Sequence, residues 1–301
     1  MEQRLLVISP VHNEAAHIER VALAMATQTR RPDLWILIND QSTDETPQIL
    51  AGLAERLDFI SVLDSPPRTD TPSSKDRLAV ALEARAFNLA LNSVDWRTFT
   101  HIAKLDGDIE LPPRYFELLL DEFEKDSTLG LAGGVLKESD GSQGREDRPS
   151  DYHVRGALKC YTRECLSAIG GIEERLGWDA IDDIYARMKG FKTRTMPQLT
   201  GLHLRTCGSA DGILRGTARH GQCAYIIHFP LPWISLRAVK VAGYRPIVLS
   251  GFAFLWGYLW AGVVKTPRVE DPAFRTFVRR ELSTRTRNAL KPQRWKLSQE
   301  A

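Results

Sequence analysis

Cysteine is scarce in this sequence, and none of it is clustered as a disulfide framework or a zinc site would require. The 301 residues include four cysteines, none of them in a CxxC pair, which is the spacing that such sites commonly use. The first apolar run, residues 5–8, is too short for a secretory signal or a membrane span. No GxGxxG motif follows this run, which argues against a dinucleotide-dependent dehydrogenase. We therefore expect a cytoplasmic protein without disulfides.

The chain as a whole carries little excess charge, with a net charge of +2. This small value is the sum of two parts of opposite charge. Residues 201–301 carry 16 Lys and Arg against 5 Asp and Glu, a net charge of +11, which leaves −9 on residues 1–200. The basic part has no RNA-binding signature but contains a long apolar segment. This combination favours an anionic membrane surface over nucleic acid as its partner.

The long apolar segment, residues 246–264, has nineteen residues without a charge between Arg245 and Lys265. Its length is borderline, since about 20 residues cross a bilayer. Trp256 and Trp260 lie near its middle, whereas spanning helices carry such residues near their ends. Three alternatives stay open: a membrane span, a helix or hairpin lying in the interface, and a buried core helix. With the basic tail, we expect attachment to the inner face of the plasma membrane.

The first half of the chain alternates short apolar runs with segments of helical periodicity, which predicts an α/β fold with a mainly parallel sheet. The runs at 5–9, 34–38 and 100–105 each end in a polar loop. In a parallel sheet such loops gather at one edge, where ligands bind. Residues 42–45, Ser-Thr-Asp-Glu, would also suit a helix N-cap. In the first loop, the residues expected to bind a ligand are Pro10, His12, Asn13 and Glu14.

The third of these loops carries Asp106 and Asp108 on either side of Gly107. Glycine lets the backbone turn sharply, so both carboxylates can face one point just beyond the strand. Oxygen ligands of this kind select Mg²⁺ or Mn²⁺, which usually keep some waters and share other positions with substrate phosphates. The simpler interpretation is a turn between two elements.

Three motifs resemble, in order and spacing, the amino-terminal motifs of family 2 glycosyltransferases with the GT-A fold: SPVHNE at 9–14, INDQSTD at 38–44 and LDGD at 105–108. The resemblance covers about residues 4–205. It implies an inverting enzyme that moves a sugar from a nucleoside-diphosphate sugar to a glycan or lipid-linked acceptor. It also implies a catalytic domain at 1–208, with a donor half at about 1–110 and an acceptor half at about 111–208, before a helical membrane-associating region at 209–301.

The same resemblance assigns roles to individual residues. Asp40 matches the residue that binds the nucleotide base, although Asn39 stands where a paired aspartate is common. Asn88 lies on a helix near the sugar nucleotide, as a structural or binding residue, and His203 matches a third metal ligand of some GT-A enzymes. Arg219 resembles a residue of a basic loop that closes on the diphosphate, but a basic surface that faces a membrane would look the same.

Inversion by direct displacement needs a base that accepts the proton of the acceptor hydroxyl. In the family this aspartate begins a helix about eleven residues before its closing glycine, which points to Asp179, counted back from Gly190. Trp178 replaces the usual preceding acidic residue. Asp182 and Asp183 are the alternatives if the alignment shifts by one helical turn. All three aspartates would also suit a helix amino terminus through capping and the helix dipole.

Two polar loops are candidates for closing over a ligand. The first, residues 65–77, is rich in Pro, Ser and Thr and carries Arg68 and Lys75. We expect either side chain to contact a diphosphate, unless the loop is merely solvated. The second, residues 138–151, is almost wholly polar, which predicts either a lid or a disordered segment.

Two other functions share part of this pattern. A sugar-nucleotide nucleotidyltransferase would need a Gly-rich phosphate loop where this chain has PVHNE at 10–14. A non-catalytic binding protein of the same fold would have lost a metal carboxylate or the base, yet Asp106, Asp108 and Asp179 are all present. The sequence therefore favours a glycosyltransferase that depends on Mn²⁺ or Mg²⁺.

Overall fold

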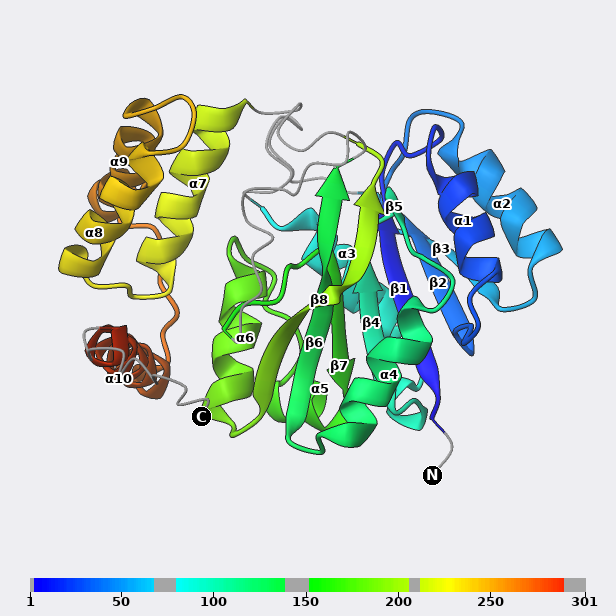
Figure 1. Ribbon diagram of the computed structural model, residues 1–301. Coiled ribbons are helices and arrows are strands. Elements are labelled where there is room, and N and C mark those ends of the chain that lie inside the picture. The colour runs from blue at the N-terminus through cyan, green and yellow to red at the C-terminus, as the bar shows by residue number, and fades with distance from the viewer. Residues whose placement is uncertain (1–2, 68–79, 139–151, 206–211, 290–301) are drawn as a thin grey trace, which may run out of the picture. The chain divides into compact units, whose positions relative to one another are not determined.

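The structure, a computed structural model, describes residues 3–67, 80–138, 152–205 and 212–289. The chain divides into two compact units, Met1–Gly212 and Ile213–Ala301. The first unit combines a β-sheet with helices, whereas the second is built from helices (Figure 1).

The first unit is built on one eight-stranded sheet in the order β3-β2-β1-β4-β7-β6-β8-β5. Strands β1 to β4 are parallel to one another and β6 is parallel to β8, while β5 and β7 run antiparallel to their neighbours. The predicted α/β fold with a mainly parallel sheet is confirmed. The strands are β1 (Leu5–Val11), β2 (Leu34–Asn39), β3 (Ile60–Asp64), β4 (His101–Leu105), β5 (Ile109–Glu110), β6 (Leu129–Glu138), β7 (Leu158–Thr162) and β8 (Lys192–His203).

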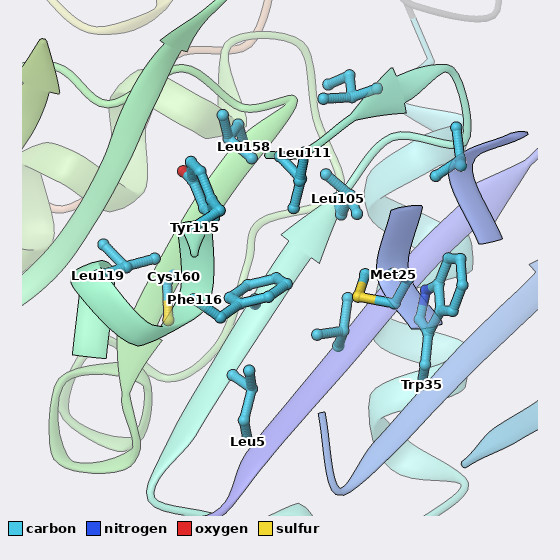
Figure 2. Packing of buried hydrophobic residues seen from close by; sticks show 14 of the residues in the cluster. Leu5, Met25, Trp35, Leu105, Leu111, Tyr115, Phe116, Leu119, Leu158 and Cys160 are labelled. Carbon is cyan, nitrogen blue, oxygen red and sulfur yellow. The ribbon is translucent and has the colours of Figure 1, made fainter. Parts of the chain in front are cut away.

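Helices cover both faces of this sheet, because alternate side chains of each strand point to opposite sides. In β1, Leu5 and Val7 join a core with α1, α2 and α4, part of which Figure 2 shows, whereas Leu6 and Ile8 join a core with α3, α5 and α6. Burial on both faces explains why the strands read as continuous apolar runs. The helices are α1 (Ile18–Ala26), α2 (Thr46–Arg56), α3 (Leu82–Asn92), α4 (Tyr115–Lys125), α5 (Arg163–Ile169) and α6 (Trp178–Met188), with a short 3-10 turn at Trp96–Thr98.

Strand β8 is longer than the sequence predicts. The pattern indicates a strand at 193–196, but β8 continues to His203 after a register shift beside Gly134 of β6. The short strand β5, which the sequence does not predict, pairs with this extension, and Ile109 lies opposite His203. The pairing brings His203 beside the loop that holds Asp106 and Asp108.

The second unit contains α7 (Ile213–Ile226), α8 (Leu231–Ala242), α9 (Leu249–Val263) and α10 (Pro272–Ala289). Helices α7 and α9 approach closely at two glycines. A Cβ atom on Gly221 would lie 2.0 Å from the carbonyl oxygen of Phe254, and one on Gly257 would lie 1.8 Å from that of Ala218. No side chain fits at either position without moving the helices apart.

Helix α9 holds most of the apolar segment, and one of its faces is exposed. Phe254 and Tyr258 are buried, whereas Phe252 and Trp256 are 66% and 62% exposed. The alternative of a buried core helix is therefore wrong. Among the described residues, no helix has both the length and the apolar character that crossing a membrane requires.

Candidate active site

The carboxyl ends of β1, β2 and β4 lie at one edge of the sheet, because these strands are parallel neighbours. The loops after β1 and β2 are bonded to each other. The amide of Asn13 donates to Ser42 Oγ (3.1 Å), and the amide of Thr43 donates to Asn13 Oδ1 (2.7 Å). Asn13 has a φ of 56°, a conformation that asparagine adopts more readily than most residues. The two loops thus support one another.

The segment before α2 strengthens this contact and supplies a side-chain acceptor for the first helix amide, although the acceptor is Asp44 and not the N-cap residue itself. Glu45 precedes the helix without a side-chain capping bond. Asp44 instead accepts hydrogen bonds from the amides of Ala15 (3.3 Å) and Thr46 (3.0 Å). The Thr46 hydroxyl oxygen accepts a hydrogen bond from the backbone amide of Glu14 (2.9 Å). These polar residues hold the loop after β1 in place.

Asp40 lies almost fully buried at the end of β2. Its Oδ1 accepts a hydrogen bond from Ser65 Oγ (3.0 Å), and its carbonyl oxygen lies 2.8 Å from Nδ1 of His12. The side-chain amide of the preceding residue, Asn39, donates from Nδ2 to Asp64 Oδ1 (2.7 Å). An aspartate at that position would face the carboxylate of Asp64 and be repelled by it, which accounts for the asparagine.

Asp108 and His203 meet at the same edge. His203 Nε2 lies 3.2 Å from Asp108 Oδ2, and both side chains are largely buried. Burial disfavours the Asp108 carboxylate, but the hydrogen bond from His203 and the positive charges of His203 and Arg205 outweigh it and lower the pKa of Asp108. Asp106 has a different partner, because Lys104 donates a hydrogen bond to its Oδ1.

Glu14 completes this acidic group. Arg205 donates to Glu14 Oε1 (2.8 Å) and to the carbonyl oxygen of Asn13 (3.1 Å). The other carboxylate oxygen of Glu14, Oε2, is buried and has no hydrogen-bond partner among the described residues. Burial and the nearby charge of Asp108 raise the pKa of Glu14 to about 8. A cation placed here would relieve this repulsion between acids.

The donor atoms at this edge fit a divalent ion that is completed by its substrate. Within the described ranges, no group of three or more His, Cys, Asp or Glu side chains is arranged to hold a metal ion by itself. Asp108 and His203 nevertheless place a carboxylate and an imidazole together, and the buried Glu14 Oε2 lacks a partner. Mg²⁺ is commonly bound through one or two carboxylates plus substrate phosphates, which is the arrangement these residues allow.

Asp182 and Asp183, on α6, are buried structural acids. Asp182 accepts hydrogen bonds from Lys159 and from the hydroxyl of Tyr161, and burial raises its pKa to about 7. Asp183 accepts from Nδ1 of His153 (2.7 Å) and from the amide of Val154 (3.0 Å). Burial opposes ionisation of Asp183, but the charge of Lys159 and the hydrogen bond from His153 lower its pKa. The helix N-cap is Gly177, so the capping interpretation is wrong for both residues.

Asp179, in contrast, is accessible. Its side chain is 35% exposed, and Oδ2 lies 3.8 Å from Nε2 of His153. His153 is also exposed, yet Asp183 fixes its ring from the other side. Partial desolvation by the surrounding protein disfavours the charged imidazole, but the hydrogen bond to Asp183 and the charges of Asp183 and Asp179 raise the pKa of His153. Among the three aspartates, only Asp179 is thus free to meet a ligand.

Trp178 packs against two lysines, one bonded to Asp106 at the sheet edge and the other bonded to Asp182 on α6. Lys104 and Lys159 are opposite each other in the β4–β7 register, and both are buried. Their ammonium groups lie 5.3 Å and 5.6 Å from the centre of the Trp178 ring, within the range of a cation–π contact. Trp178 Nε1 donates to Glu83 Oε1 (3.0 Å). The charges of Asp106, Glu83 and Asp179 together outweigh burial and raise the pKa of Lys104. Lys104 therefore interacts both with Asp106 at the sheet edge and with Asp179 at the start of α6.

Four residues of the site, Lys104, Lys159, His153 and Arg205, were not predicted from the sequence. A signal was present for Lys104, since it interrupts the apolar run at 100–105. Asn88 donates to the carbonyl oxygen of Ile172 (2.8 Å) and to Glu174 Oε1 (3.1 Å), so it connects α3 to the segment after α5.

Several predicted features cannot be placed at this site. Arg68, Lys75 and residues 139–151 lie outside the described residues. Arg219 is buried on α7 in the second unit. Their roles stay predictions.

The fold and site define an α/β protein with acidic side chains gathered at the carboxyl edge of parallel strands, where proteins of this architecture bind nucleotides. The chain belongs to the glycosyl transferase family 2, whose model matches residues 6–166, and the resemblance of the sequence motifs is confirmed. It is therefore a glycosyltransferase. No curated protein sequence matches the chain.

Solved structures resemble the chain at low sequence identity. The mannosyltransferase PcManGT from Pyrobaculum calidifontis, in complex with GDP-Man and Mn²⁺, has a TM-score of 0.57 and 20% identity over 97% of this chain and 82% of that chain. S. aureus TarS 1–349 has a TM-score of 0.54 and 14% identity over 85% and 71%, and its complex with UDP-GlcNAc has 0.55 and 14% over 85% and 72%. A longer TarS chain is covered over 43% of its length. At such identities the likeness shows the GT-A fold alone.

The division between buried and accessible acids predicts a difference in stability. Asp183→Asn removes the negative charge that faces the buried Lys159 and the partly exposed His153, and removing one partner of a buried ion pair costs about 3–5 kcal/mol. Asp179→Asn changes a partly exposed carboxylate, so its cost should be about 1 kcal/mol or less. Urea denaturation at neutral pH measures both free energies of unfolding. Equal losses in the two variants would contradict the assignment.

Proposed function

We propose that the protein is an inverting glycosyltransferase that moves a sugar from a nucleoside-diphosphate sugar to a hydroxyl of a glycan or lipid-linked acceptor, with Mn²⁺ or Mg²⁺. The observation that carries the proposal is the position of Lys104. Lys104 donates a hydrogen bond to Asp106, in the loop after β4, and its ammonium group lies 5.3 Å from the ring centre of Trp178, which directly precedes Asp179 at the start of α6. The residues proposed for the leaving group and for the base therefore lie near one another, as a direct displacement requires.

The donor nucleotide is proposed to bind at the loops after β1 and β2. Asp40 is held at the edge by Ser65 and would accept hydrogen bonds from the base. Pro10, His12 and Asn13 would line the same pocket, since their loop is bonded to residues 42–46. PcManGT was solved with GDP-Man and TarS with UDP-GlcNAc, which supports a nucleoside diphosphate of this kind.

Asp108 and His203, together with Asp106, would hold the divalent ion. When bound, this ion supplies a Lewis acid for the charge that develops on the leaving diphosphate. Arg205 would add positive charge at the same place, because it already bonds to Glu14 and lies 3.9 Å from Asp108 Oδ2.

Asp179 would act as the general base. The acceptor hydroxyl gives its proton to the Asp179 carboxylate while its oxygen forms a bond to the anomeric carbon, and the bond from that carbon to the diphosphate oxygen breaks. His153 would position the carboxylate, since Asp183 holds its ring at 2.7 Å. Asp182 and Asp183 are unsuited to the role because they are buried and already bonded.

The second unit is proposed to attach to an anionic membrane, at the inner face of the plasma membrane. Helix α8 exposes Leu236 and Val239 at 69% and 74%, and α9 exposes Phe252 and Trp256. Arg237, on the same helix as Leu236, is charged. Apolar side chains beside basic ones bind the interface through burial of the former and attraction of the latter to anionic lipids.

The metal assignment predicts the behaviour of Asp108→Asn. Loss of this carboxylate should lower donor turnover on the order of 10²-fold or more, because a Lewis acid contributes several kcal/mol. Calorimetry with Mn²⁺ and a nucleoside diphosphate should show weaker metal binding. The control is Asp58→Asn, an exposed aspartate just before β3, at the opposite edge. Unchanged Mn²⁺ affinity in Asp108→Asn would refute the assignment.

The base assignment predicts a different signature for Asp179→Asn. Transfer to the acceptor should fall about 10²- to 10⁴-fold, the usual contribution of a general base, while nucleotide and Mn²⁺ affinities stay unchanged. Steady-state kinetics and calorimetry measure the two effects, with Asp58→Asn again as the control. Retention of transfer activity would exclude Asp179 as the base.

The membrane proposal predicts that Phe252→Ser/Trp256→Ser weakens binding to phosphatidylglycerol vesicles. Removing two large apolar side chains from the interface should lower the partition coefficient about tenfold or more. Co-sedimentation of the full chain measures it. Leu23→Ser, which changes a 59% exposed side chain of α1, is the matched control. Equal binding of both variants, or none by the unchanged chain, would count against attachment through α9.

A further inference from the structure

The second unit contains an open hollow that the proposed reaction does not use. Its volume is about 640 Å³. It lies where the end of α7 and the segment before α10 meet the first turns of α10. The residues that line it are His228, Arg268, Val269, Glu270, Asp271, Pro272, Arg275, Thr276 and Arg279.

Three of the lining residues are arginines, which make the hollow basic. Arg275 and Arg279 are four residues apart on α10, so they project from the same face of the helix. Neither guanidinium has an ion-pair partner in the part of the chain that the structure describes. Arg268 is fixed from behind, because its guanidinium carbon lies 3.6 Å from the centre of the Tyr225 ring. The planar donors of arginine match the oxygens of a phosphate.

His228 shows that positive charge prevails at one end of the hollow. Its backbone has a φ of 63°, and Nε2 donates to the carbonyl oxygen of Val269 (2.7 Å). Burial and repulsion from Arg268, Arg275 and Arg279 lower the pKa of His228, although the bond to Val269 raises it. An anion between the arginines would remove that repulsion.

The two acids of the lining offset only part of the charge of the three arginines, and within the described residues neither forms an ion pair with Arg275 or Arg279. Asp271 Oδ1 accepts the amide of Ala273 (2.8 Å), at the start of α10. Glu270 is exposed to solvent.

We propose that this hollow binds a phosphate group through Arg275 and Arg279, with Arg268 as a third, pre-positioned donor. The volume exceeds that of a bare phosphate, so the group is expected to be part of a larger molecule. A lipid headgroup and a dissolved phosphate ester share this chemistry.

The test uses the full chain and two probes. Calorimetry with inorganic pyrophosphate, in EDTA so that no divalent ion supports binding elsewhere, compares Arg275→Gln/Arg279→Gln with Arg280→Gln/Arg287→Gln. The second variant removes two exposed arginines of the same helix that do not line the hollow. Affinity should fall about tenfold or more in the first variant alone, given the strength of charge-assisted hydrogen bonds.

Phosphatidylglycerol vesicles then separate the two sources of phosphate. If vesicle binding also falls only in Arg275→Gln/Arg279→Gln, the ligand is a lipid headgroup. If vesicle binding is the same in both variants while pyrophosphate affinity differs, the ligand is a dissolved phosphate ester. If the two variants match the unchanged chain, or each other, with both probes, the proposal is wrong.

Discussion

Two buried lysines, Lys104 of β4 and Lys159 of β7, are opposite each other in the middle of the sheet, and the site depends on how their charges are satisfied. A buried charge without a partner costs several kcal/mol. Lys104 is therefore bonded to Asp106, and Lys159 to Asp182. The first bond fixes the loop after β4 and the second fixes helix α6, while Trp178 covers both ammonium groups.

The need to pair the buried lysines distinguishes acids that stabilise the fold from acids that can bind a ligand. Asp182 and Asp183 are buried, and their carboxylates accept hydrogen bonds from groups inside the protein. Asp179 stands at the start of the same helix with part of its carboxylate exposed. Asp108 is likewise set beside His203 at the sheet edge. The proposed mechanism assigns the base to Asp179, which is partly exposed, and the metal to Asp108, which is largely buried beside His203.

Much of the first unit was predictable because its signals are local. Apolar runs and polar loops mark β1, β2 and β4, and parallel pairing brings their ends together whatever the loops contain. The extension of β8 to His203 was not predictable, because it depends on pairing with Ile109, far away in the sequence. The roles of Asp182 and Asp183 were missed for the same reason, since their partner Lys159 comes from another strand.

The central claim is that this edge of the sheet binds a sugar nucleotide and releases its diphosphate. A panel of nucleoside-diphosphate sugars with Mn²⁺ or Mg²⁺, followed by release of free nucleoside diphosphate, tests it most directly. The account predicts release from at least one uridine or guanosine diphosphate sugar, and loss of that release in EDTA. Failure of every member of the panel to bind or react, with either metal ion, would contradict it.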